Sequence, residues 1–224
     1  MTQPRLKADL HVHTCYSKDS TSRPDEIVAH CLSSGINCLA ITDHDTIAGA
    51  LEMERRAPLK IIVGEEILTT RGELIGLFLH EHVPGHLSPE DTVKRIKAQG
   101  GLVLVPHPFD RFRPHSRLQR RALDRIASDL DLVEIFNART MLLQDSNRAS
   151  RFASSLGLPG TAGSDAHVVR EIGRTFMELA DFNGAENFKH ALTGCRISMA
   201  RTSPVVHFYN IRNRMLKLVK GHNV

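Results

Sequence analysis

Residues 7–14, Lys-Ala-Asp-Leu-His-Val-His-Thr, form the stretch on which the fold prediction rests. Alternate residues of a β-strand share a face, so Asp9, His11 and His13 point one way and the apolar residues between them point the other. Two histidines and an aspartate are costly to bury unless they are paired or bind a ligand. The stretch therefore predicts a first strand that carries metal ligands near its carboxyl end, with a solvated polar face as the alternative.

Strand-like and helix-like segments alternate along the rest of the chain. Ser22-Arg-Pro-Asp25 and Ser88-Pro-Glu-Asp91 each combine a capping serine, an early proline and an acid, which is typical of a helix start. Repeated strand–helix units predict an α/β fold with a mostly parallel sheet, whose chemistry gathers at the carboxyl ends of the strands. The predicted strands are residues 7–14, 37–42, 60–67, 73–79, 102–106, 131–136 and 160–164.

The composition fits one α/β domain with at most a small appendage. The chain has 224 residues, of which 41% are hydrophobic and 24% charged. Its four cysteines form no CxxC pair, and we see neither a signal peptide nor an apolar stretch of about 20 residues. We therefore expect a cytoplasmic protein without a membrane span, and the net charge of +4 weakly favours anionic partners.

Polar side chains also end other predicted strands. His44 lies in Thr42-Asp-His-Asp45, His107 lies between two prolines, and Asp165 and His167 follow the last strand on one face. Each has a structural alternative, such as a helix cap or a satisfied histidine, but their coincidence at strand ends predicts a shared site. Mixed imidazole and carboxylate ligands suit zinc, manganese or iron rather than calcium. Their number predicts a cluster of two or three ions, which is suited to phosphoester cleavage.

Two adjacent glutamates end the third predicted strand. Neighbouring residues of a strand face opposite sides, so only one of Glu65 and Glu66 can join the other ligands. If the following turn is centred on Thr69 and Thr70, Glu66 lies directly opposite Glu73, with Cβ atoms about 4.5–5.5 Å apart. Two carboxylates that close favour a cation between them. This register therefore predicts that Glu66 and Glu73 bind a metal together.

These motifs resemble the PHP family of phosphoesterases, named for polymerases and histidinol phosphatases. The match covers about residues 7–200 and includes DLHVHT, TDHDT, a glutamate after a glycine, HP and SDAH in the family's order. The resemblance implies a distorted seven-stranded β/α barrel, a PHP metal-dependent phosphoesterase domain over residues 1–200, and two or three divalent ions.

The resemblance also implies which side chains hold the ions. The expected ligands of one ion are His11, His13, Glu66 and Asp165. Those of a second ion are Asp19, His44 and His167, and Glu66 bridges to a third ion near His107. The residues implied in catalysis are His11, His13, His44, Glu66, Asp165 and His167.

The sequence departs from the family pattern at one place. Many members carry a histidine three residues before the glycine of the fourth strand, where this chain has Glu73 before Gly76. A carboxylate is a harder ligand than imidazole, which shifts the expected metal from zinc toward manganese or iron. His80 is the fallback ligand, although it falls on the opposite strand face from Glu73.

Basic residues near the motifs are candidate phosphate contacts, because a guanidinium group can bind two phosphate oxygens at once. A solvated basic surface is an equal alternative for the segment between residues 111 and 121. Residues 201–224 are predicted to form a basic amphipathic tail that docks on the barrel, with an RNA or membrane-surface role as the lesser alternative. The candidate arginines are Arg111, Arg139 and Arg170, with Arg117, Arg120 and Arg121 as an extension toward a longer polyanion.

The predicted reaction is hydrolysis of a phosphomonoester or phosphodiester. Ser164 lacks the Gly-x-Ser-x-Gly elbow of covalent hydrolases, so an activated water is the expected nucleophile. By resemblance, the substrates are nucleoside bisphosphates or short 5′-phosphorylated oligonucleotides cleaved in an exonuclease-like way, with histidinol phosphate or another small phosphate as the nearest alternative. A non-catalytic module that binds nucleic acid or polymerase subunits, and a cluster that cleaves a non-phosphate bond, are further alternatives.

Overall fold

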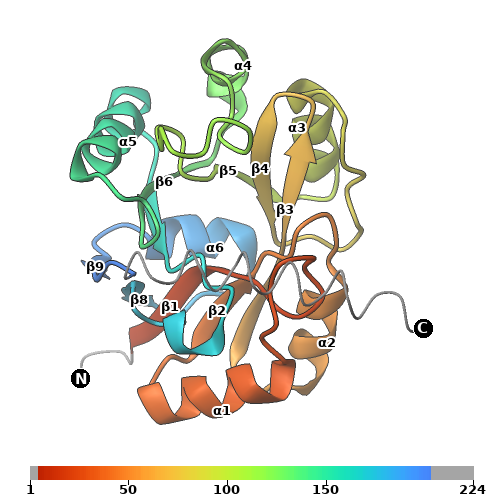
Figure 1. The fold of residues 1–224 in the computed structure, drawn as a ribbon, viewed down its shortest axis with the longest axis vertical. Coiled ribbons are helices and arrows are strands. Elements are labelled where there is room, and N and C mark those ends of the chain that lie inside the picture. Colours follow the sequence, from red (N-terminus) through yellow and green to blue (C-terminus); the bar gives the residue numbers. More distant parts are fainter. Residues whose placement is uncertain (1–4, 203–224) are drawn as a thin grey trace.

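The computed structural model describes residues 5–202, so nearly all of the predicted C-terminal tail lies outside the described residues. Within this range no helix is both long enough and apolar enough to cross a membrane. The elements, shown in Figure 1, are β1 Arg5–Val12, α1 Pro24–Ser34, β2 Cys38–Ile41, α2 Ala48–Arg56, β3 Lys60–Thr69, β4 Gly72–Leu77, α3 Pro89–Ala98, β5 Leu102–Val105, α4 Arg120–Ile126, η1 Ala127–Asp129, β6 Leu132–Asn137, α5 Leu143–Leu156, β7 Gly160–Gly163, η2 Val169–Glu171, β8 Phe176–Ala180, α6 Gly184–Ala191 and β9 Arg196–Ser198.

The strands form a nearly closed barrel. All seven predicted strands are present as β1 to β7, in a described sheet of nine strands with the order β7-β6-β5-β4-β3-β2-β1-β8-β9. An isolated parallel bridge joins Val12 to Ala166, and the His13 N–H donates to the Ala166 carbonyl at 2.9 Å, so the end of β1 lies beside the end of β7. The α/β barrel class is confirmed, whereas β8 and β9 make the strand count nine rather than seven.

Strand direction brings the predicted ligands to one end of the barrel. β1, β2 and β3 run parallel to one another, as do β5, β6 and β7, while β4 is antiparallel to both of its neighbours. The carboxyl ends of the parallel strands and the beginning of β4 therefore meet at the same end. Glu73 lies near the start of β4 and is therefore at the same end of the barrel as the ligands that follow the other strands.

The β3–β4 hairpin has a different register from the predicted one. Leu68, not Glu66, lies opposite Glu73, and the strands part at Thr69 and Gly72. Gly72 has a φ of 118°, which favours glycine, and a Cβ there would lie 2.5 Å from the Cα of Leu118. This tight contact places the turn after Thr69 and moves the register by two residues. Because two residues is one full period of a strand, Glu66 and Glu73 still share a face as diagonal neighbours.

The helices begin and end where local chemistry dictates, and they cover the barrel. Ser88 caps α3 as predicted, accepting the Asp91 N–H at 3.1 Å. The predicted cap Ser22 is one residue early, because Pro24 at the first helical position puts Arg23 at the N-cap of α1. In Figure 1, α1 and α2 lie at the bottom of the molecule and α3, α4 and α5 at the top. Buried Phe188 of α6 packs on Phe182 with ring centres 5.0 Å apart.

Candidate metal centre

All of the predicted metal ligands lie in one connected cluster at this end of the barrel. Each has an imidazole nitrogen or carboxylate oxygen within 4.0 Å of an opposite partner in the cluster. All are buried except His44, which is partly buried. The members are His11, His13, Asp19, His44, Glu66, Glu73, His107, Asp165 and His167.

Glu66 occupies the middle of this cluster. Its Oε2 lies 3.3 Å from Nε2 of both His11 and His13, and 3.4 Å from Nδ1 of His44. Its Oε1 lies 3.2 Å from Nε2 of His107. One carboxylate thus faces four imidazoles from three segments of the chain, which is the arrangement expected of a bridging ligand. The adjacent Glu65 points elsewhere and accepts hydrogen bonds from His82 and from the Val83 N–H.

Three overlapping groups have the geometry to hold a metal ion. In each, one ligand atom per residue lies within 4.8 Å of the others: His13 with His44 and His167, His11 with His13 and Glu66, and Glu66 with Glu73 and His107. His13 belongs to two groups, whereas the family resemblance implied it in one. Asp19 borders the first group, because its Oδ1 lies 3.4 Å from Nε2 of His167.

The chemistry of these side chains fits divalent cations. His13 Nε2 and Asp165 Oδ1 are buried and have no hydrogen-bond partner among the described residues. Burial and the nearby Glu66 raise the pKa of Glu73 to about 8, because two carboxylates at this distance repel each other. Buried polar atoms without partners and neighbouring acids are both relieved by a bound cation.

Hydrogen bonds orient the imidazoles so that a lone pair faces the cluster. His167 Nδ1 donates to the Asp165 carbonyl at 2.9 Å, and His11 Nδ1 donates to Glu134 Oε1 at 3.0 Å. His13 Nδ1 lies 3.2 Å from Ser17 Oγ, which itself donates to Asp43. In each ring Nδ1 is engaged, and Nε2 faces the carboxylates of the cluster, where a metal would bind. Burial, with His13 and Arg139 nearby, lowers the pKa of His167 to about 4, which keeps this ring neutral as metal binding requires.

The close approach of β1 and β7 requires a glycine. A Cβ on Gly163 would lie 2.5 Å from the Cβ of His11 and 2.8 Å from its backbone nitrogen. Just beyond it, Asp165 adopts a positive φ of 53°, and His107 at the end of β5 has a φ of 31°. Such backbone conformations are uncommon for residues other than glycine and gather at functional sites.

Several supporting residues were missed by the sequence analysis. Glu134 on β6 accepts from the His11 ring through Oε1, and from the His107 N–H at 2.8 Å through Oε2. Asn137 donates to Glu134 at 3.0 Å and to Asp165 Oδ2 at 3.2 Å. The available signal was an acid within an otherwise apolar strand, Leu-Val-Glu-Ile-Phe at 132–136.

Arg113 is the other missed residue. Its Nη2 lies 2.6 Å from Asp165 Oδ2, and its Nε lies 3.4 Å from Asp110 Oδ2. Burial alone raises a carboxyl pKa, yet the adjacent Arg113 and His11 hold the pKa of Asp165 well below its usual range. Arg113 thus orients one oxygen of Asp165 and leaves the other, Oδ1, facing His11 and His13.

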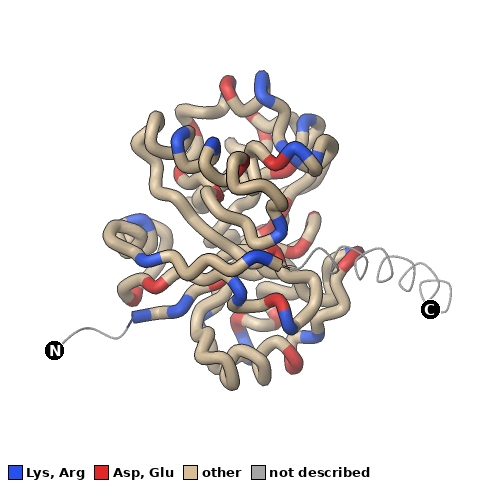
Figure 2. The backbone as a smooth tube through the Cα atoms, turned by 60° about the vertical axis from the view of Figure 1, so that its left-hand side comes forward, with Lys and Arg blue, Asp and Glu red and all other residues tan. Residues whose placement is uncertain are grey.

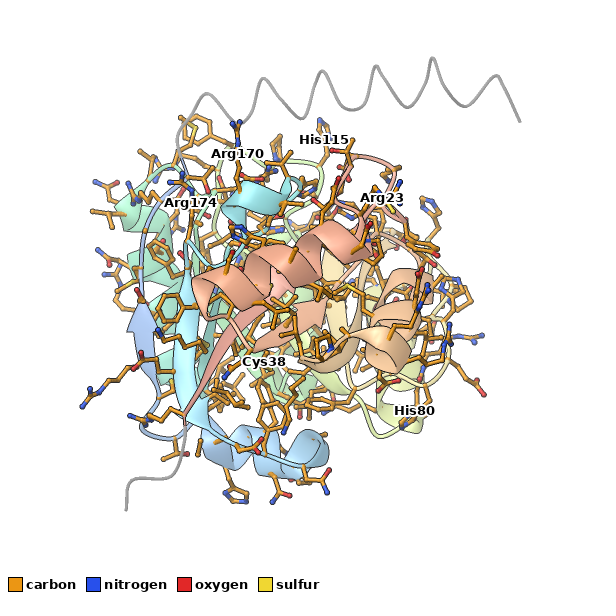
Figure 3. All side chains as sticks on the ribbon, turned by 90° about the horizontal axis from the view of Figure 1, so that it is seen from below. Arg23, Cys38, His80, His115, Arg170 and Arg174 are labelled. Atoms are coloured by element: carbon orange, nitrogen blue, oxygen red, sulfur yellow. The ribbon has the colours of Figure 1, made fainter. Side chains whose placement is uncertain are left out.

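The arginines predicted to bind phosphate are placed differently from that prediction. Arg111 pairs with Asp145 at 2.9 Å and does not line the cavity above the cluster, because α5 presents that carboxylate to it. Arg139 does line the cavity, but its guanidinium is buried against Glu171 at 2.9 Å. Exposed Arg170 on η2 is absent from the cavity lining. The fallback ligand His80 is also exposed, and Figure 3 shows it on the opposite side of the molecule from Arg170.

A cavity of about 490 Å³ opens above the cluster. Its floor consists of cluster residues, and its walls come from the loop after β1, from residues 110–116 and from the segment after β6. Among the wall residues, Lys18 and His115 form no ion pair or hydrogen bond with any other residue of the described part. Wall and floor residues together are Lys18, Asp19, His44, Glu66, Leu68, Glu73, Asp110, Phe112, Arg113, His115, Ser116, Arg139, Met141, Asp165 and His167.

The barrel and its ligand cluster define a class, that of α/β barrel proteins with a metal centre at the carboxyl ends of the strands. The PHP domain family matches residues 9–82, and the PHP-associated family matches residues 144–193. An uncharacterized protein of Methanocaldococcus jannaschii is 44% identical over 147 residues, which cover 59% of this chain and 82% of that protein. The chain belongs to the PHP family.

Two of the solved structures that share the fold cover most of this chain. One is a two-domain protein from Bacteroides vulgatus that contains a predicted PHP-like metal-dependent phosphoesterase, with a TM-score of 0.68, 18% identity, and coverage of 88% of this chain and 66% of that one. The other is Endonuclease Q in complex with a 27-mer duplex substrate that has an abasic lesion at the active site, with a TM-score of 0.58 and 16% identity. The likeness to Endonuclease Q covers 85% of this chain and 57% of that chain.

Proposed function

We propose that this protein hydrolyses a phosphoester at the metal centre. The observation that carries the proposal is the convergence of eight ligand-type side chains around Glu66, in a cluster beneath a cavity with basic walls. Divalent ions in such a centre supply an activated water and neutralise charge on the phosphoryl oxygens. Carboxylate and imidazole ligands together favour manganese, zinc or iron.

The proposed ligands follow the three groups of side chains, with Asp165 added to one set and Asp19 in place of His13 in another. His11, His13, Glu66 and Asp165 would hold one ion, and His44 and His167 with Asp19 a second. Glu66, Glu73 and His107 would hold a third. The catalytic residues in this proposal are His11, His13, His44, Glu66, Asp165 and His167. Arg113 and Glu134 act as positioning residues, because each fixes a ligand by a direct hydrogen bond or ion pair.

The substrate phosphate has suitable partners in the cavity walls. Lys18 and His115, rather than Arg111 and Arg170, are the basic side chains that line the cavity without a partner in the described part of the chain. Arg139 also faces the cavity but is held by Glu171. Ser164 is buried and does not line the cavity, which favours water over serine as the nucleophile.

The substrate class that we propose is a nucleoside bisphosphate or a short 5′-phosphorylated oligonucleotide. The fold shared with Endonuclease Q, which was solved on a DNA duplex, is compatible with this class. A small phosphate such as histidinol phosphate remains the alternative substrate. The protein would then use the same metal centre and ignore nucleic acid.

An assay of phosphoester cleavage tests the proposal. Purified protein would be given manganese and, in parallel, a nucleoside 3′,5′-bisphosphate, a 5′-phosphorylated oligonucleotide and histidinol phosphate. We expect cleavage of the first two, its loss on addition of a chelator, and no cleavage by the His11→Ala variant. Absence of cleavage of all three substrates with manganese, zinc and iron would overturn the proposed function.

A further inference from the structure

The cavity above the metal centre has an apolar part that neither the ligands nor the basic side chains explain. Phe112 and Met141 both line the cavity, and 57% of Phe112 and 45% of Met141 is exposed. Large apolar side chains exposed beside convergent polar groups are typical of a ligand-binding surface. Phe109, three residues before Phe112, is instead buried against Phe152, so the loop divides its two phenylalanines between core and cavity.

A chain of contacts links the backbone of Phe112 to Asp165, a proposed metal ligand. Its N–H donates to Asp110 Oδ1 at 3.0 Å, while Asp110 Oδ2 lies 3.4 Å from Arg113. Arg113 in turn contacts Asp165 Oδ2 at 2.6 Å. The backbone on both sides of Phe112 is therefore anchored to a proposed metal ligand, although the phenyl ring is exposed.

Met141 lies two residues after a segment that is anchored to the same carboxylate. Asn137 donates to Asp165 Oδ2 at 3.2 Å, and the Arg139 N–H donates to Asn137 Oδ1 at 2.9 Å. The Met141 carbonyl accepts from Arg201 at 3.0 Å. Two loops thus each contact Asp165 Oδ2 and each present an exposed apolar side chain to the same cavity.

We propose that Phe112 and Met141 form a binding surface for a nucleobase whose phosphate lies at the metal centre. The inference rests on the proposed function and narrows its substrate to a nucleotide. A base stacks on an aromatic ring whatever its identity, and a methionine side chain adapts to a planar partner. The unpartnered Lys18 and His115 on the same cavity complement the negative charge of the phosphate at the other end of such a ligand.

Leu143 provides a matched control. It is 60% exposed and lies two residues beyond Met141, but it does not line the cavity. A surface for docking another protein would include Leu143, because that surface would extend beyond the cavity. A surface for a nucleobase linked to the phosphate would not include it.

Calorimetric titration of the manganese-loaded protein tests the inference. Adenosine 5′-monophosphate and ribose 5-phosphate carry the same phosphoester and differ in the base. We expect the nucleotide to bind roughly tenfold more tightly than the sugar phosphate, in line with the contribution of one stacked base. Phe112→Ala and Met141→Ala should each remove most of this difference without weakening ribose 5-phosphate, and Leu143→Ala should leave it intact.

Two results would overturn the inference. One is equal affinity of the wild-type protein for the two ligands, including no binding of either. The other is a preference for the nucleotide that survives in both Phe112→Ala and Met141→Ala. The outcome is separate from that of the proposed function, because the difference in affinity between the two ligands does not require that either be cleaved. A preference that depends on Phe112, in a protein that cleaves no phosphoester, would uphold the base-binding surface and reject the hydrolase.

Discussion

At the scale of single residues, Glu134 shows how the centre is held. Its two oxygens accept from the His11 ring and from the His107 N–H, so one buried carboxylate fixes two proposed ligands. A glutamine has one acceptor oxygen and would have to turn its NH2 group toward a donor. We expect Glu134→Gln to weaken metal binding about 10- to 100-fold, the usual cost of losing such a support.

Metal affinity of the Glu134→Gln variant can be measured by competition with a chelator. The exposed Glu186→Gln substitution on α6 serves as the control and should bind metal like the wild type. Wild-type affinity in Glu134→Gln would show that His11 is positioned without this hydrogen bond.

Glu73 determines the choice of metal in this account. Its Oε2 lies 3.8 Å from the His107 ring and its Oε1 lies 3.9 Å from the His44 ring. We expect Glu73→His to retain substantial activity and to shift the bound metal toward zinc, because imidazole is the softer ligand. Elemental analysis after loading from an equimolar mixture of manganese and zinc measures the shift. An unchanged ratio would remove Glu73 from the metal ligands.

At the scale of secondary-structure elements, the site depends on the close contact of β1 with β7. Gly163→Ala would place a Cβ 2.5 Å from His11 Cβ, in a region with no room to relax. We expect a loss of about 1–3 kcal/mol in the free energy of unfolding, together with weaker metal binding, because His11 must shift.

Gly157→Ala is the comparison for this prediction. Gly157 ends α5 with a φ of 66° and has nothing near its Cβ position, so alanine costs about 1 kcal/mol in backbone strain only. Urea unfolding should show both variants destabilised, and metal titration should distinguish them. Equal metal affinity in the two variants would mean that the barrel absorbs the displacement of β1.

Arginines in and around α4 are candidate contacts for an oligonucleotide, although some of them pair with acids. Arg120 pairs with Asp124 at 2.8 Å and Arg125 with Glu90 at 2.6 Å, and Figure 2 shows basic and acidic residues side by side at this end of the molecule. If the substrate is an oligonucleotide, replacing Arg117, Arg120 and Arg121 together should weaken binding and lower its salt dependence by roughly one unit per lost phosphate contact.

Binding of a 5′-phosphorylated oligonucleotide over a range of salt concentrations measures this effect. Cleavage of a nucleoside bisphosphate should not change, and replacement of Arg55 and Arg56 on α2 should leave both activities as in the wild type. An unaltered salt slope in the triple variant would make the segment a solvated surface.

Local patterns in the sequence were enough to predict β1 to β7 and the faces of their polar residues. Alternation of polar and apolar residues determines which side of a strand a residue faces, and proline and glycine mark where strands and helices end. β8 and β9 were missed because Phe176–Ala180 and Arg196–Ser198 are not rich in Val, Ile and Leu, the composition on which the strand predictions rested. The Glu66–Glu73 register was wrong because a distant contact, Gly72 against Leu118, places the turn.

The residues missed at the site share one property, which is that their roles depend on contacts between distant segments. Arg113 reaches Asp165 across the barrel mouth, and Glu134 reaches His11 from β6. Arg111, rather than Arg113, was predicted to contact the substrate, because nothing in the local sequence reveals that Arg111 forms an ion pair with Asp145. The order of the strands in the sheet determines which distant side chains meet, and the sequence pattern alone does not reveal that order.

At the scale of the whole molecule, the metal centre and the fold are separable in this account. The core contains enough buried apolar side chains to persist when one ligand is removed. We expect His11→Ala, His44→Ala and Asp165→Ala each to abolish activity and to keep wild-type circular dichroism spectra. Global unfolding of all three variants would indicate structural rather than catalytic metals.

We expect this end of the barrel to hold a cluster of metal ions, and the metal content of the protein is the most direct test. Protein purified without chelator would be analysed for transition metals and assayed for phosphoester cleavage before and after chelation. We expect about two or three ions per chain, as in a multinuclear hydrolytic centre, and loss of activity when they are removed. A metal-free protein with full activity in chelator would contradict it.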